Sequence, residues 1–503
     1  MKPIGSITNY FPFLVEDERK IMLSLVEQSD NYSDFVDRLH THVLTVESSD
    51  IMVFLAWHHL WGAQYFFNAR ENFLERFSQQ MWLRPEYTGW KMDTPDDDTL
   101  LEVVEDALTT STNPLILLHL YWFKMVCVRG SSTGTLTEDE TIKNLADLIR
   151  TNPPLEFARS KLYLLMGDGY ANESNPQEAM KEYDSALQHA LMYDDIVFTT
   201  SVLTRKAKLL SLTDPTKALE FIESAANQAK KLGFLERSVG IFTVMGVIFD
   251  ARGEYDAAVK SFQEELELRE KQNPQASLRL TPSALSRSYR RMGKFKEALE
   301  WAKTALTIKY MSSSRVQSIG VQVLANLCMS AAHAMLGNIE DAKSYHDVGN
   351  ELALKAGIEV WLSDVLLSEG LISRAEGRLS DALESFENAL EVMERLHRQG
   401  RINECIYLLA ETEIQHYMAS SESDGLLALH WLSTMEDMAR KKDLPGVLGL
   451  SLLLKVRMLL FQGHDEEAQS LMDQVRELSK HPGTRFLRDR IEIESSAFPL
   501  RRR

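Results

Sequence analysis

The stretch FTVMGVIFDARGEYDAAVKSF, residues 242–262, contains the pattern that decides the fold. Met245 and Phe249 are four residues apart, so both side chains lie on one face of a helix. Gly253 can adopt the left-handed backbone that ends a helix, because it has no Cβ to clash. Ala258 then falls early in a second helix, where a small side chain allows close approach to the first. The stretch therefore predicts a helical hairpin.

The glycine and the alanine five residues after it recur along the chain. The five copies are Gly253 and Ala258, Gly293 and Ala298, Gly337 and Ala342, Gly377 and Ala382, and Gly463 and Ala468. Three more alanines follow degenerate turn sequences, namely Ala179, Ala218 and Ala428. The eight alanines are 39, 40, 40, 44, 40, 46 and 40 residues apart. A period of about 40 residues predicts an array in which each helix pair packs on its neighbours.

The residues around each alanine resemble the tetratricopeptide repeat. That family has a small residue in its first helix, an aromatic residue three later, and alternating alanine and aromatic residues in its second helix. The first unit shows this pattern as Gly167, Tyr170, Ala179, Tyr183 and Ala186. The family unit is 34 residues, so the longer unit here indicates longer helices. The resemblance implies an all-α, right-handed solenoid of about eight helix pairs over residues 155–480. It also implies a concave groove that holds a peptide or protein partner.

Two further segments flank the predicted solenoid. Residues 1–152 lack the period of 40 and predict a helical domain that caps the first repeat. Its helices are expected at about 15–28, 31–46, 50–80, 97–109, 114–128 and 138–150. Residues 153 and 154 are both proline and mark the boundary, because the residue before a proline avoids helical geometry. Residues 483–503 are expected to form a closing helix and a basic tail.

Composition excludes several classes of protein. The 503 residues contain 73 acidic and 55 basic side chains, a net charge of −18, which argues against a nucleic-acid binder. Cys127, Cys328 and Cys405 form no CxxC pair, so a reducing cytoplasm is expected. The N-terminus has no continuous apolar run, so no signal peptide is indicated. The apolar run Leu115–Val128 is too short to span a bilayer, so no membrane association is expected.

One basic stretch interrupts the acidic composition. Residues 271–296 contain seven basic residues and no acidic residue. Arg287, Arg290 and Arg291 share one face of a predicted first helix, and first helices line the groove in the family resembled. Arginines there would recognise a carboxylate or a phosphate by bidentate pairing. The candidate anchors of an acidic partner are Arg279, Arg287, Arg290, Arg291 and Lys294.

The alternative is that these arginines pair within the chain, with Glu264, Glu265, Glu267 and Glu270 of the preceding helix. The chaperone-binding clamp known in some tetratricopeptide proteins is not reproduced, because its lysine and asparagine positions in the first unit fall on Leu164 and Asp168.

No motif indicates a cofactor, a metal or catalysis. His58 and His59 are adjacent on a predicted helix and cannot share a ligand face, and no HExxH is present. Asp96, Asp97 and Asp98 lack the glycine and terminal glutamate of an EF-hand. The segment from Gly130 to Gly134 lacks the lysine of a phosphate-binding loop.

The sequence therefore predicts a non-catalytic scaffold or adaptor in the cytoplasm. One alternative is a regulatory protein whose array closes around an effector. Another is an enzyme with an unrecognised site in residues 1–152.

Overall fold

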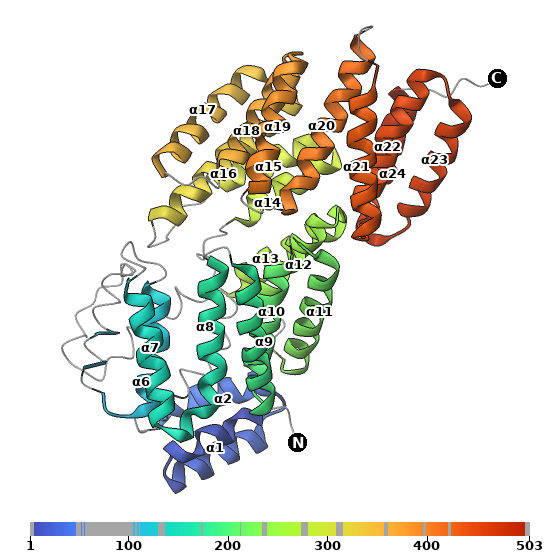
Figure 1. The fold of residues 1–503 in the computed structure, drawn as a ribbon. Coiled ribbons are helices and arrows are strands. Elements are labelled where there is room, and N and C mark those ends of the chain that lie inside the picture. Colours follow the sequence, from blue (N-terminus) through green and yellow to red (C-terminus); the bar gives the residue numbers. More distant parts are fainter. Residues whose placement is uncertain are drawn as a thin grey trace.

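The structure is a computed structural model that describes residues 5–46, 111–128, 136–172, 175–211, 213–233, 239–272, 280–307, 315–356, 361–395, 399–420 and 424–497, with a few isolated residues between 52 and 109. Every regular element in these ranges is a helix (Figure 1). The all-α prediction is therefore confirmed. The predicted helices at 50–80 and 97–109, and the residues His58, His59, Asp96–Asp98 and Gly130–Gly134, lie outside the described residues.

Eight helix pairs form the array, and the first helix of each pair is named its A helix and the second its B helix. The A helices are α8 (Arg159–Asn172), α10 (Ile196–Leu210), α12 (Val239–Ala251), α14 (Thr281–Met292), α16 (Arg315–Met335), α18 (Leu362–Ala375), α20 (Gln399–Ala419) and α22 (Pro445–Gln462). The B helices are α9 (Pro176–Met192), α11 (Pro215–Lys231), α13 (Tyr255–Gln272), α15 (Phe295–Thr307), α17 (Ile339–Ala356), α19 (Leu379–Arg395), α21 (Leu426–Lys441) and α23 (Asp465–Leu478).

The repeated alanines pack each B helix on its A helix, as predicted. All eight are fully buried, from Ala179 in α9 to Ala468 in α23. The turn glycines also adopt the predicted backbone, and Gly253 has φ +73°. Helix length varies from 12 residues in α14 to 21 in α16 and α20, which accounts for the unequal repeat spacing.

An aromatic ring of the B helix lies on a glycine of the A helix in three pairs. These contacts are Tyr183 on Gly167, Phe262 on Gly246 and Phe386 on Gly370. A Cβ placed on Gly370 would lie 2.7 Å from Cδ1 of Phe386, which is closer than real Cβ atoms approach. The glycine is therefore required by close packing rather than by its backbone angles.

The N-terminal helices pack on the first pairs of the array. They are η1 (Gly5–Phe13), α1 (Glu16–Gln28), α2 (Tyr32–Thr45), α6 (Pro114–Val128), α7 (Leu136–Thr151) and η3 (Pro153–Ala158). One core joins them to α8, α9 and α10 and includes Phe35, Trp122 and Phe198. The side-chain amide of Asn9 donates to the Tyr193 carbonyl at 3.1 Å. The proposed boundary near residue 152 stays a prediction.

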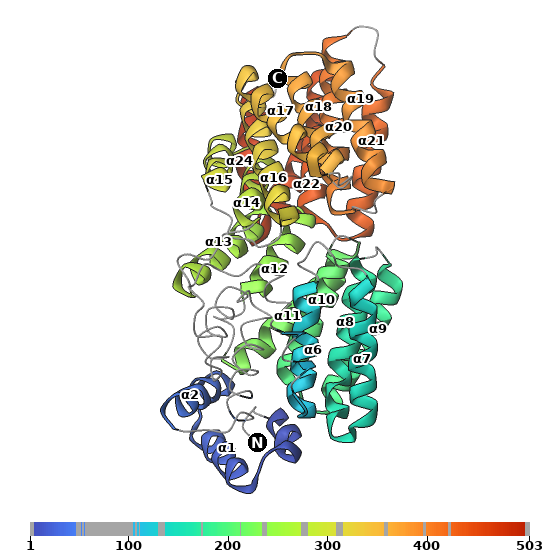
Figure 2. The same cartoon turned by 90° about the vertical axis from the view of Figure 1, so that its left-hand side faces the viewer.

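The C-terminal pairs return to contact the middle of the array (Figures 1 and 2). Helix α20 contacts α12, η6 (Pro482–Thr484) contacts α13, and α24 (Phe486–Ala497) contacts α14. The Asn403 amide donates to the Ala251 carbonyl at 3.1 Å, and the Phe486 amide donates to the Asp256 carboxylate at 2.7 Å. We name this set of contacts the closing contact.

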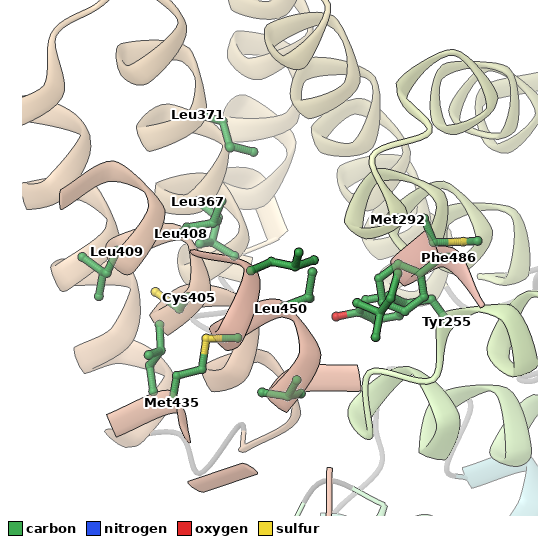
Figure 3. Packing of buried hydrophobic residues seen from close by; sticks show 14 of the residues in the cluster. Tyr255, Met292, Leu367, Leu371, Cys405, Leu408, Leu409, Met435, Leu450 and Phe486 are labelled. Carbon is green, nitrogen blue, oxygen red and sulfur yellow. The ribbon is translucent and has the colours of Figure 1, made fainter. Parts of the chain in front are cut away.

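Backbone and aromatic packing make the closing contact tight. The start of α22 lies directly on the turn before α13, and a Cβ on Gly446 would overlap the Gly253 carbonyl. The rings of Tyr255 and Phe486 have centroids 5.0 Å apart. Figure 3 shows these two rings beside Met292, across from Leu450. The array from α12 to α24 is therefore closed on itself rather than an open coil.

We predict that Gly370→Ala lowers the stability of the array by about 1–3 kcal/mol, because the new methyl group displaces the Phe386 ring. Thermal unfolding followed by circular dichroism measures the change. The double variant Gly370→Ala, Phe386→Leu should recover part of the loss, since the smaller side chain leaves room for the methyl group. Additive losses in the double variant would contradict this account.

Candidate functional site

The A helices form the inner layer of the array. In most neighbouring pairs, one A helix packs on the next, as α16 does on α14 and α18, whereas neighbouring B helices contact each other less. Helix α14 belongs to this inner layer and contains three of the predicted anchors. It begins with Pro282 in its first turn and ends at Gly293, which has φ +84°. Arg290 and Arg291 fall in its last turn, where cations are favoured by the helix dipole.

Arg290 and Arg291 form ion pairs across the closing contact. Both guanidinium groups bind the carboxylate of Glu404 on α20, and Arg291 also binds Asp250 on α12. The side chains of Arg290, Arg291 and Glu404 are only 10%, 7% and 3% exposed. These pairs are therefore buried, where losing one partner leaves a charge without compensation.

A third arginine completes the environment of Glu404. Arg401, one turn earlier on α20, approaches the Glu404 carboxylate at 3.1 Å and also binds Asp364 of α18. Burial would raise the pKa of Glu404, but Arg291, Arg290 and Arg401 together hold this pKa well below its ordinary value. Glu404 is therefore a permanent anion that joins α14 to α20.

Arg287 differs from its neighbours on α14. It makes no ion pair or hydrogen bond with any residue that the structure describes. Burial and the nearby positive charge of Arg401 both lower the pKa of Arg287, and Asp364 and Asp250 offset this only in part. The guanidinium group is thus held among charged groups without a carboxylate of its own.

The two remaining predicted anchors do not join this cluster. Lys294 pairs with Asp489 of α24 at 3.4 Å, on the side of α14 that faces the C-terminal helix. Arg279 lies outside the described residues. The alternative pairing with the preceding helix is wrong for Arg290 and Arg291, because their partners come from α12 and α20 instead.

A second buried cluster lies further along α20. Glu411 accepts from Arg374 of α18 at 2.6 Å, and Arg457 of α22 approaches it at 3.6 Å. Arg457 also pairs with Glu494 of α24, and Arg490 donates to the Tyr407 hydroxyl at 2.6 Å. Burial would raise the pKa of Glu411, but the arginines lower it to about 2. Charged side chains therefore join four helices at this end of the array.

The sequence analysis did not identify the residues that pair with the predicted anchors and with each other, namely Asp250, Asp364, Arg401 and Glu404. Within neighbouring pairs a signal existed, because Arg401 follows Asp364 by 37 residues and Arg291 follows Asp250 by 41. Opposite charges one repeat apart on A helices therefore mark such contacts. Glu404 lies 114 positions from Arg290, and no repeat spacing indicates that pair.

Neither cluster has the composition of a metal centre. Within the described ranges, no group of three or more histidine, cysteine, aspartate and glutamate side chains is placed to hold a metal ion. The carboxylates named above are bound by arginines instead.

Helix α22, rather than Leu115–Val128, is the longest strongly apolar segment. By length and composition it is the one helix in the described part of the chain that could cross a membrane, with a mean hydropathy of 1.4 over 18 residues. Residues of α22, among them Val447, Leu450 and Leu453, are buried in the core shared with α20, α23 and α24. A core position accounts for its composition.

Comparisons with known proteins agree with this architecture. A family model of the tetratricopeptide repeat matches residues 242–276. No curated protein matches the chain by sequence. Among solved structures, the chain is similar to a Rap protein complexed with competence and sporulation factor, with 16% identity and a TM-score of 0.51 over 69% of this chain and 92% of that one.

Two further solved structures are similar at lower TM-scores. Aspartyl phosphate phosphatase F from Bacillus subtilis has 12% identity and a TM-score of 0.45, over 76% of this chain and 92% of that one. A signal transduction ATPase with a tetratricopeptide repeat sensor from Pyrococcus horikoshii has 12% identity and a TM-score of 0.35, over 93% of this chain and 75% of that one. The present chain has the helical-repeat fold of the tetratricopeptide-like superfamily.

We expect Glu404→Gln to weaken the closing contact, because Arg290, Arg291 and Arg401 lose their shared anion. Breaking a buried pair costs about 3–5 kcal/mol. Hydrogen exchange should become faster in α12 and α14 while α8 and α9 stay protected. Glu384→Gln, on the exposed face of α19, serves as the matched control and should leave the exchange unchanged. Equal protection of α12 in both variants would argue against the role of Glu404.

The array should lose stability as the pH falls from about 4.5 towards 2. The folded-state pKa of Glu411 is lowered to about 2 from an ordinary 4.5, so its contribution is complete above 4.5 and lost as the group is protonated. The contribution is about 3 kcal/mol. Thermal midpoints of the wild type and Glu411→Gln should differ at pH 7, approach each other as the pH falls below 4.5, and converge only below about pH 2. A difference that does not depend on pH would contradict this assignment.

Proposed function

We propose that this chain is a non-catalytic protein-interaction module that binds an acidic peptide or protein segment on the inner layer of its A helices. The observation that carries the proposal is the position of the basic stretch. Arg287, Arg290 and Arg291 of this stretch lie on α14, an inner helix, within a chain of net charge −18. Arginine clusters of this kind recognise carboxylates through paired hydrogen bonds.

The comparisons support the general role. The array contains a tetratricopeptide repeat, and the similar Rap protein was solved in complex with a factor. An identity of 16% supports a shared fold only, so we infer the partner of this chain from its own residues. The buried free thiols of Cys328 and Cys405 suit the reducing cytoplasm that we propose as its location.

The predicted anchors would act in two ways. Arg287 contacts no carboxylate among the described residues, so a partner could bind it without displacing one. Arg290 and Arg291 are bound by Glu404, so a partner would have to exchange its own carboxylate for that of Glu404. Such an exchange would leave the Glu404 carboxylate, which is only 3% exposed, without its arginines, so Arg287 is the anchor that a partner engages at the lower cost.

The closing contact favours a second candidate function, a regulatory protein whose array closes around an effector. Glu404 on α20 joins this helix to α14 across the closed segment, so an effector that binds beside these arginines would favour the closed arrangement. Such a switch requires that both an open and a closed arrangement of the array are populated.

Affinity purification tests the interaction module. Arg287→Glu should reduce recovery of the partner at least tenfold, because it replaces the free guanidinium by a carboxylate that repels an acidic segment. Lys296→Glu makes the same change of charge on the exposed surface of α15 and should leave recovery unchanged. Equal recovery with both variants, at unchanged helical circular dichroism, would refute the proposed anchor.

A further inference from the structure

The charges where α12, α14, α18 and α20 meet do not balance. The positive side chains are Arg287, Arg290, Arg291 and Arg401, and the negative ones are Asp250, Asp364 and Glu404. Among the residues that the structure describes, four cations thus face three anions, which leaves one positive charge in excess. Folded proteins seldom hold a charge in such a place without a partner, because removal from water is costly.

The excess charge can be assigned to one residue. Arg290, Arg291 and Arg401 each contact at least one carboxylate, whereas Arg287 contacts none in the described part of the chain. The groups whose charges act on the pKa of Arg287 are Arg401, Asp364 and Asp250, together with the thiol of Cys328. Arg401 and Asp364 already bind each other, and Asp250 binds Arg291.

A small ligand can reach this position. Along α14 the residues from Thr281 to Ser286, and Ser288, are buried, but Arg287 keeps partial exposure. The Arg287 side chain is therefore only partly enclosed, between helices that bury the rest of the cluster. Arginine offers five donors in a planar fork, which matches an oxyanion bound through two oxygens.

We propose that Arg287 binds one carboxylate of a ligand inside the closed array. A carboxylate supplies the single negative charge that makes four cations face four anions. A phosphate group carries about −1.5 to −2 charges at pH 7 and would reverse the imbalance. The carboxylate belongs either to a free small acid or to an acidic segment of the partner proposed above. In the second case the inference deepens the proposed function.

Binding at Arg287 also stabilises the closing contact. The ligand removes the repulsion between Arg287 and Arg401, two cations on helices that the closing contact brings together. The arrangement of α14 against α20 is then favoured by a neutral cluster. We therefore expect ligand binding to raise the thermal midpoint of the array.

Thermal unfolding at constant ionic strength tests the proposal on the full chain. Sodium acetate and a blocked peptide of three glutamates are titrated against sodium chloride. Either carboxylate should raise the midpoint of the wild type in a saturable manner, by about 2 °C or more. A response to acetate identifies a site open to free acids, and a response to the peptide alone identifies a site for an acidic segment.

Arg287→Gln separates a ligand site from a structural arginine. In chloride its midpoint should equal or exceed that of the wild type, because the variant removes a cation that has no partner. Its response to acetate and to the peptide should be lost. Arg290→Gln is the matched control and should lower the midpoint in every buffer, because it breaks a pair with Glu404.

Three results would overturn the proposal. The first is a lowered midpoint of Arg287→Gln in chloride, which would mark a structural residue. The second is a wild type that responds to neither carboxylate, or a variant that responds as strongly as the wild type. The third is a stronger response to inorganic phosphate than to acetate. None of these measurements needs a protein partner. If Arg287→Glu leaves partner recovery unchanged while acetate still raises the midpoint of the wild type, only the proposed interaction module is refuted.

Discussion

Close contact between an aromatic ring and a glycine is the constraint on which the array depends. In the pair α18 and α19, Phe386 lies on Gly370 and fixes how near the two helices approach. The buried alanine Ala382 sets the same distance one turn away. Two other pairs repeat this contact, and the stacking of pair on pair brings α20 back to α12. The buried ion pairs form because this stacking also brings α20 to α14.

The residues that were predicted correctly interact locally. The eight buried alanines and the left-handed glycines follow from spacings shorter than one helix pair. Sequence also placed Arg287, Arg290 and Arg291 on one helix of the inner layer. The sequence could not indicate that Glu404 pairs with Arg290 and Arg291, because this contact depends on how the helix pairs between α14 and α20 are stacked. A small change in the rotation of each pair would move Glu404 away from α14.

The two ends of the array are held together by different kinds of contact. Around Phe35 and Trp122 the helices share an apolar core, whereas α14 and α20 meet through Arg291 and Glu404. Apolar side chains can pack against many kinds of neighbour, whereas paired hydrogen bonds between arginine and carboxylate require a defined geometry. The ion pairs therefore make the closed arrangement specific. Arg287, which contacts no carboxylate among the described residues, is the position at which a ligand would affect this arrangement.

The contact between Gly253 and Gly446 has a consequence for how this protein can evolve. Open repeat arrays gain or lose units by duplication, because each unit touches only its neighbours. Here an inserted helix pair would shift α22 by about 10 Å, the usual distance between packed helices, and separate the two glycines. The number of repeats between α12 and α22 is thus held constant. The closed segment therefore favours divergence through substitutions, loop length and units added outside it.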